Sequence, residues 1–383
     1  MSEQHAEGGH RVTPFELFFD LVFVFALTQV TTFLADDPTW HGLARALLLL
    51  GALWWSWAAY AWLTNTIDPD EDAVLAAMLV AMAAMFLAAL AVPGAFTDHR
   101  LLFGVAFLVV ILMYLALFSL GARDDPDLLT VVVRGARATV AGAALILVAA
   151  FVPGGVRPFL WLAALLIGLV GPAFGALEGW RLHRAHFVER HSLIVIIALG
   201  ESLIAVGIGA RETSIGAEVV VAALLGLAIA TSFWVAYFDF FALRFPVLLA
   251  ERRGVARIAL ARDAYSYLHL PMVAGIVLSA FAMREAIAHT GRDLATVPAL
   301  ALAGGSALYV SSYVAMRWRV THALRSGRLV ATIAFAALIP VARIVPAVAA
   351  LALVAAVWTG LHAYEIVWWR EARAASRALR PLA

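Results

Sequence analysis

Residues 73–92 read AVLAAMLVAMAAMFLAALAV, an unbroken apolar run without a charged side chain. An α-helix needs about 20 such residues to cross the hydrocarbon core of a bilayer. Similar runs recur along the whole chain. They lie at roughly residues 15–34, 42–64, 73–92, 101–120, 130–151, 158–178, 190–210, 217–242, 264–284, 296–316, 328–344 and 346–368. The sequence therefore predicts an all-α, polytopic membrane helix bundle of about 12 transmembrane helices. Arg343 separates the last two runs only weakly, so one kinked or re-entrant segment is the alternative there.

The composition of the chain excludes several classes of protein. Of the 383 residues, 64% are hydrophobic and 14% are charged, and the mean hydropathy is +0.92. Soluble domains are about 45–50% apolar and about 25% charged, so a soluble enzyme and a disordered chain are excluded. A net charge of +1 gives no field that attracts nucleic acid. The absence of lysine and cysteine excludes Schiff-base chemistry, disulfides and thiolate metal sites. The aromatic residues are expected mainly on lipid-facing surfaces and in interfacial belts.

Arginine placement predicts the orientation of the spans. Residues 1–10 lack arginine, so the first apolar run is expected to be a retained helix, not a cleaved signal peptide. Eighteen of the 27 arginines fall on the side of the N-terminus, six on the opposite side and three near span ends. The eighteen are Arg11, Arg123, Arg181, Arg184, Arg190, Arg244, Arg252, Arg253, Arg257, Arg262, Arg317, Arg319, Arg325, Arg328, Arg370, Arg373, Arg377 and Arg380. The positive-inside rule then predicts a multi-pass protein of the cell membrane with both termini cytoplasmic.

Two pairs of similar motifs, one member in each half of the chain, favour an internal duplication. Aligning Trp55 with Trp234 gives an offset of 179 residues, and aligning Glu178 with Glu365 gives an offset of 187. The similarity of these two offsets favours repeat halves at residues 11–185 and 186–370, as in several transporter classes. Both halves are expected to belong to a single integral membrane domain, residues 1–383. The alternative is that aromatic belts recur near helix ends in any membrane protein.

Two acids interrupt the first apolar run. Glu16 and Asp20 are four residues apart, so they share one helix face, while Gln29 points to roughly the opposite face. Asp20 lies about 7 Å inside the run. A charge at the bilayer centre costs about 2.5–3.5 kcal/mol, and two acids on one face repel unless a cation, a donor or a shared proton relieves them. The alternative to a functional role is favourable placement at a helix N-terminus with a structural arginine partner.

A third acid is expected at the middle of the bilayer. Glu201 follows His191 by ten residues, or about 15 Å along a helix, and lies between Gly200 and Ser202. Small neighbours let other helices or water approach closely. We expect a protonatable acid on an ion or substrate path. The alternative is a protonated glutamate hydrogen-bonded to a neighbouring helix.

Other ionisable residues are predicted near the cytoplasmic ends of the spans. They are Asp239, Asp263, His269, Glu178, His362 and Glu365, which, with nearby arginines, would form a cluster on that side of the bundle. Individually, each of them is more typical of an interfacial anchor. The acidic run at 68–72, DPDED, is predicted to cap a helix that starts at Ala73, in preference to binding a divalent cation.

Four motifs taken together resemble the low temperature requirement protein A family of bacterial membrane proteins. They are residues 14–26, PFELFFDLVFVFA, with Gln29; residues 54–65, WWSWAAYAWLTN, with Asp68; residues 189–202, ERHSLIVIIALGES; and residues 234–239, WVAYFD. The resemblance implies an integral membrane protein linked by name to growth in the cold. Residues 18–23 are also similar to the Phe-Ser-Asp motif of a potassium and proton channel family with six-helix repeats, with Phe19 in place of the serine.

These observations favour a transporter- or channel-like bundle that moves an unknown small solute or ion. Its candidate transport or binding residues are Glu16, Asp20, Glu201, Asp239, Arg190, His191, Asn65 and Gln29. The alternatives are a membrane-embedded enzyme acting on a lipid or lipid-linked substrate, and a non-catalytic stress-related membrane protein. The sequence predicts the lipid bilayer as a partner and no nucleic acid, cofactor or metal, and it leaves a homo-oligomer open.

Overall fold

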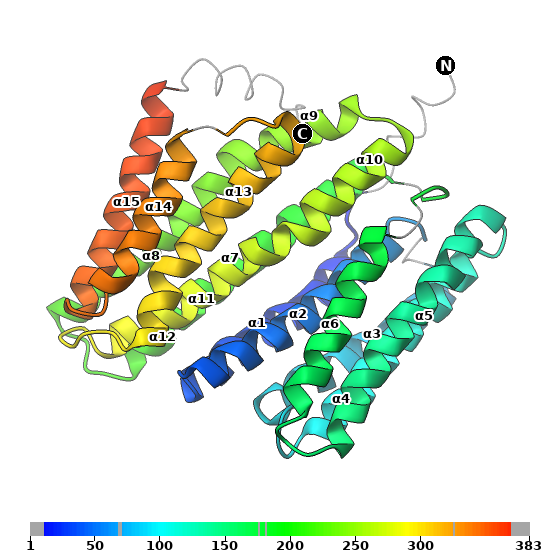
Figure 1. The fold of residues 1–383 in the computed structure, drawn as a ribbon, viewed down its shortest axis with the longest axis horizontal. Helices are drawn as coiled ribbons and strands as arrows, with labels where there is room; N and C mark the ends of the chain where they lie inside the picture. Colours follow the sequence, from blue (N-terminus) through cyan, green and yellow to red (C-terminus); the bar gives the residue numbers. More distant parts are fainter. Residues whose placement is uncertain (1–10, 68–70, 175–176, 181, 325, 369–383) are drawn as a thin grey trace. The chain divides into compact units, whose positions relative to one another are not determined.

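A computed structural model describes residues 11–67, 71–174, 177–180, 182–324 and 326–368, and in these ranges helices joined by turns and loops make up the protein (Figure 1). Within these ranges there is no strand, and ten helices are long and apolar enough to cross a membrane. Two shorter apolar helices, Arg157–Gly171 and Gly327–Val341, account for the two other predicted spans. The predicted all-α polytopic bundle is therefore confirmed.

The helices follow one another in this order: α1 Pro14–Asp36, α2 Trp40–Leu63, α3 Asp72–Ala91, α4 Arg100–Gly121, α5 Pro126–Val148, α6 Arg157–Phe174, α7 Arg184–Arg211, α8 Ala217–Ala236, α9 Ala242–Glu251, α10 Gly254–Ala261, α11 His269–Ala288, α12 Thr296–Ala299, α13 Gly305–Thr321, α14 Ser326–Val341 and α15 Ala347–Trp368. Short 3₁₀ segments, η1 Val92–Gly94 and η2 Ala149–Phe151, follow α3 and α5. Several predicted charges, namely Asp68, Asp70, Arg181, Arg325, Arg370, Arg373, Arg377 and Arg380, lie outside the described residues.

Three later spans are interrupted by π-helical segments. These are η3 Tyr237–Phe241 between α8 and α9, η4 Arg262–Tyr267 between α10 and α11, and η5 Leu300–Gly304 between α12 and α13. The span that contains η4 runs from Gly254 to Ala288. It begins ten residues before the apolar run at 264–284 that predicted it. The early part was missed because α10 carries Arg257 and is followed by Arg262 and Asp263, which lower its hydropathy without breaking the helix.

The two expectations about helix ends have clear outcomes. The chain does not run as one kinked segment past Pro340 and Pro346: α14 ends at Val341, and α15 begins at Ala347, whose backbone N–H donates to the Arg292 carbonyl at 2.7 Å. In the acidic run, α3 begins at Asp72, and Glu71 occupies the N-cap without a side-chain cap hydrogen bond. Asp72 in the first turn still favours the helix dipole.

The chain divides into two compact units. The first comprises Met1–Phe33, Ala44–Ile194 and Arg252–Arg262, and the second comprises Leu34–Leu43, Val195–Glu251 and Asp263–Ala383. In the first unit α3 packs on α4, α4 on α5 and α5 on α6. In the second, α11 packs on α13, α13 on α14, α14 on α15 and α15 on α8. Both units thus pack sequential helices side by side, while the duplication itself stays a prediction.

Large aromatic side chains fill the interior of both units. Trp54, Trp57 and Trp161 are buried in the first unit, and Trp358 is buried in the second. The prediction that aromatic residues lie mainly at lipid-facing and belt positions is therefore wrong for these four. Two of the buried rings have a partner for their polar atom, because the Trp57 indole N–H donates to Asp20 Oδ1 and the Trp358 indole N–H donates to Ser306 Oγ.

Gly209 of α7 provides a test of close helix packing. A Cβ atom at this position would lie 2.5 Å from the Arg284 carbonyl oxygen of α11, whereas a Cβ at Gly207, two residues earlier, meets no described atom within 4 Å. We expect Gly209→Ala to destabilise the protein by about 1–3 kcal/mol through overpacking. The matched control Gly207→Ala gains helix propensity without the clash.

Thermal unfolding in detergent, followed by intrinsic tryptophan fluorescence, measures both glycine variants. Equal melting temperatures for the two variants would show that α7 and α11 do not approach each other as described.

Candidate functional site

The N-terminus of α1 is closed by a capping box. The Thr13 backbone N–H donates to Glu16 Oε2 at 3.0 Å, and the Glu16 backbone N–H donates to Thr13 Oγ1 at 3.2 Å. Pro14 at the first helical position is typical of this arrangement. The Thr13-Pro14-Phe15-Glu16 sequence therefore fixes the Glu16 carboxylate at the start of α1, so this acid has a structural role at the helix end.

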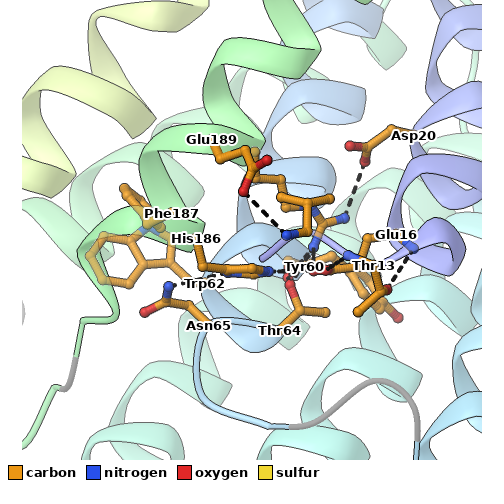
Figure 2. Close-up of polar contacts among 12 residues, drawn as sticks. Thr13, Glu16, Asp20, Tyr60, Trp62, Thr64, Asn65, His186, Phe187 and Glu189 are labelled. Atoms are coloured by element: carbon orange, nitrogen blue, oxygen red, sulfur yellow. Dashed lines mark hydrogen bonds and ion pairs between the residues drawn. The ribbon is translucent and has the colours of Figure 1, made fainter. Parts of the chain in front are cut away.

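Arg190 of α7 joins the two acids of α1. Its Nη1 donates to Glu16 Oε1 at 3.0 Å, and its Nη2 donates to Asp20 Oδ1 at 3.1 Å. Nη1 also donates to the Tyr60 carbonyl and to Thr64 Oγ1 of the first unit. The side chains of Glu16, Asp20 and Arg190 are fully buried. Figure 2 shows Glu16 and Asp20 projecting from α1 into this cluster.

The two carboxyl groups have unequal surroundings. Glu16 accepts hydrogen bonds from the Thr13 backbone, from Arg190 and from His186, whose Nε2 lies 2.9 Å from Oε2 and 3.0 Å from Oε1. Asp20 Oδ1 accepts from Arg190 and from the Trp57 indole N–H at 2.8 Å. Among the described residues, none donates to the buried Oδ2 of Asp20. One arginine thus serves two acids, and only Glu16 is fully hydrogen-bonded.

Asn65 ties the start of α7 to the end of α2. Its Nδ2 donates to the His183 carbonyl at 2.9 Å, and its Oδ1 accepts from the His183 backbone N–H at 2.8 Å. The same Nδ2 lies 3.4 Å from Nδ1 of His186, one turn before Arg190. Figure 2 shows Asn65 and His186 side by side. Asn65 therefore orients the helix turn that brings both His186 and Arg190 to Glu16.

The other sequence-predicted residues lie at varied positions. His191 is buried, donates from Nδ1 to the Phe187 carbonyl at 2.8 Å, and lies edge-on to Trp57 with ring centroids 5.0 Å apart. Gln29 is half-buried further along α1. Glu201 is buried in the part of α7 that belongs to the second unit, and Asp239 lies half-buried in η3 of the same unit. The structure thus brings together Glu16, Asp20, Arg190, His191 and Asn65.

Most of the residues expected to cluster at the cytoplasmic ends of the spans belong to the second unit, while Glu178 belongs to the first. Asp263 accepts from Arg319 at 2.7 Å, Glu365 accepts from Arg328 at 2.7 Å, and Tyr237 OH lies 3.0 Å from His269 Nε2. Arg328 also lies over the Tyr313 ring at 4.4 Å. Asp263 and Glu365 thus pair with different arginines, and Glu365 Oε2 also lies 4.0 Å from His362 Nδ1. Among the described residues, no group of three or more His, Asp or Glu side chains is arranged to hold a metal ion.

The sequence predicts Arg190 as a candidate residue and does not identify His186. It places Arg190 at the start of a span, whereas α7 begins at Arg184 and the Arg190 side chain is buried. With that start, His186 and Arg190 are four residues apart and share one face. The helix α2 and the residue after it supply the third side of the cluster, next to α1 and α7. The sequence signal for it is the helical spacing of Trp57, Tyr60 and Thr64, which puts them on one face.

Removing the shared cation tests the cluster. Arg190→Gln leaves the ionised Glu16 carboxylate buried without its guanidinium, so we expect a loss of about 3–5 kcal/mol of stability. Adding Glu16→Gln to this variant should restore part of the loss, because paired changes in one network are not additive. Arg123→Gln, at a surface position where the side chain is 70% exposed, is the matched control.

Tryptophan fluorescence melting suits this comparison, because the chain has 12 tryptophans and no cysteine for thiol-reactive dyes. Equal melting temperatures for Arg190→Gln and Arg123→Gln would refute the proposed burial of a shared ion pair.

Comparison with known proteins agrees with the motifs that build this cluster. The chain is 29% identical over 329 residues to Uncharacterized protein RA0937 of Rhizobium meliloti (strain 1021), which covers 79% of this chain and 76% of the relative. A family model described as bacterial low temperature requirement A protein (LtrA) matches residues 11–363, a range that contains every residue of the cluster and nearly all of the helices. The chain therefore belongs to the low temperature requirement A family of bacterial membrane proteins.

Proposed function

We propose that this protein is a transporter- or channel-like membrane protein that moves a small solute or ion, with the cluster of Glu16, Asp20, His186 and Arg190 on its path. The observation that carries the proposal is the second acid. A structural ion pair needs one carboxylate for one guanidinium, and Glu16 already supplies it along with the helix cap. Asp20 adds a further buried acid that neither the cap nor the pair requires.

The cost of burial argues that this extra acid has a purpose. Ionisable groups inside a membrane-spanning helix are expensive, and they commonly line ion or substrate pathways. Arg190 contributes one positive charge, while Glu16 and Asp20 contribute up to two negative charges. An arrangement that is one positive charge short of neutrality is suited to bind and release a cation or to interact with a charged solute.

Transport through this cluster requires a change of conformation. Glu16, Asp20, His186 and Arg190 are all buried, so the cluster is occluded in this conformation. Occluded sites are opened to alternate sides when one part of a bundle moves against another.

Glu201 and Asp239 are separate candidates that belong to the second unit. Glu201 is buried within α7, and Asp239 lies in η3. We propose that both contribute to ion binding within that unit, on the basis of their intramembrane positions. The distribution of the loop arginines supports placement in the cell membrane with both termini cytoplasmic.

Reconstitution into liposomes tests the proposal. Ion gradients (H⁺, Na⁺ and K⁺ in turn) are imposed across liposomes that contain the protein, and their decay is followed with entrapped ion-sensitive dyes. We expect the protein to speed the decay of at least one gradient, and Asp20→Asn to return that rate to the level of protein-free liposomes. Asp36→Asn, which changes an exposed acid at the other end of α1, is the matched control and should leave the rate unchanged.

Two results would overturn the transport proposal: rates with the wild-type protein that equal those of empty liposomes for every ion, or an Asp20→Asn variant as fast as the wild type. Either result would favour a structural role for the cluster.

A further inference from the structure

We propose that Asp20 Oδ2 is a binding site for a single proton, and that Asn65 directs the proton there by keeping His186 in its neutral form. This inference rests on the proposed function, because it names the ion that the cluster takes up. It stands on the hydrogen-bond geometry of Asn65, His186, Glu16, Arg190 and Asp20 in the first unit.

The orientation of the Asn65 amide is fixed by the backbone. Only the amide oxygen accepts a hydrogen bond, and it faces the His183 N–H at 2.8 Å. Only the amide nitrogen donates, and it faces the His183 carbonyl at 2.9 Å. Rotating the amide by half a turn would break both bonds, so Nδ2 is the atom that faces His186.

This orientation determines where His186 carries its hydrogen. Asn65 Nδ2 has no acceptor capacity, so His186 Nδ1, at 3.4 Å, must present its lone pair to it. The ring hydrogen is then on Nε2, which donates to the Glu16 carboxylate at 2.9 Å. An imidazolium would place an N–H against the Asn65 amide hydrogens. His186 therefore acts as a neutral donor and not as a second cation.

Charge counting then points to Asp20. With His186 neutral, an ionised Glu16 balances Arg190, and an ionised Asp20 would leave one negative charge uncompensated in a fully buried cluster. Glu16 is the stronger hydrogen-bond acceptor of the two acids, since three groups donate to it. Asp20 Oδ2 receives no donor from the described residues, so it is the oxygen on which a proton disturbs no existing hydrogen bond.

The hydrogen bonds of the groups around Asp20 are consistent with one bound proton at this site. Titratable or charged neighbours come from three elements: Glu16 on α1, Tyr60 on α2, and His186, Arg190 and His191 on α7. His191 donates from Nδ1 to a backbone carbonyl, and the Tyr60 hydroxyl donates to the Val110 carbonyl at 2.9 Å. Proton binding forms one O–H bond at Oδ2 with a proton delivered from water. The bond that breaks is one O–H bond of hydronium, which becomes water; on release the Oδ2–H bond breaks and water takes the proton back.

Infrared spectroscopy of the intact protein in lipid membranes at neutral pH tests this assignment. We expect a carbonyl stretching band of a protonated carboxylic acid that shifts when aspartate side chains are labelled with ¹³C, does not shift when glutamate is labelled, and disappears in Asp20→Asn. Asp36→Asn should keep the band. A band that follows the glutamate label, or one that persists in Asp20→Asn, would overturn the proposal, as would the absence of any such band.

A second variant tests the positioning role of Asn65. Asn65→Ala removes the amide donor that faces His186 Nδ1, so the proton should move from Asp20 to His186. The Asp20 band should then be lost, and a histidinium signal that is absent from Asn65→Ala/His186→Gln should appear in ¹⁵N-histidine NMR. An unchanged Asp20 band in folded Asn65→Ala would refute the role of Asn65.

Infrared and flux results separate this inference from the proposed function. An Asp20 band in a protein that moves no ion would refute transport and leave the proton site standing. Ion flux without an Asp20 band would do the opposite.

Discussion

The guanidinium of Arg190, shared between two carboxyl groups of α1, is the interaction on which the candidate site depends. It places Glu16 and Asp20 of one helix against the start of α7. Its positive charge offsets part of the desolvation free energy of burying their carboxyl groups. The segments that meet there are about 170 residues apart in the chain, as the Arg190–Asp20 and Arg190–Glu16 separations of 170 and 174 show. The contact is therefore tertiary, and it joins two segments that are far apart in the sequence through buried, complementary charges.

The same two acids illustrate how structure and function can be divided within one helix turn. Glu16 completes a capping box and accepts from both His186 and Arg190, so its position follows from helix-end chemistry. Asp20 lies one turn deeper, accepts from Trp57 and Arg190 at only one oxygen, and has no cap to complete. The alternative reading of the sequence, a structural arginine partner near a helix N-terminus, describes Glu16 well. That alternative does not explain why a second acid, Asp20, is buried beside the same arginine.

The sequence predicted the helical architecture well because hydropathy reports directly on which segments can enter a bilayer. It failed where charges lie inside helices. Arg257 was placed outside the predicted spans and Arg190 at the very start of one, although α10 and α7 continue through these positions. The shared face of Glu16 and Asp20 followed from i, i+4 spacing, whereas the partners from α2 and α7 depend on tertiary contacts that no local pattern encodes. Trp57 was likewise indistinguishable from a belt residue, because hydropathy does not separate lipid-facing from buried aromatic rings.

The central claim is that Asp20 is a surplus acid, neutral at rest, and not a counter-charge that Arg190 needs. The most direct test is the thermal stability of Asp20→Asn, because asparagine has the shape of a neutral aspartic acid and keeps an acceptor for Trp57 and Arg190. The account predicts that this variant unfolds at or above the wild-type melting temperature. A clear fall, of the size expected when one partner of a buried ion pair is removed (about 3–5 kcal/mol), would contradict it.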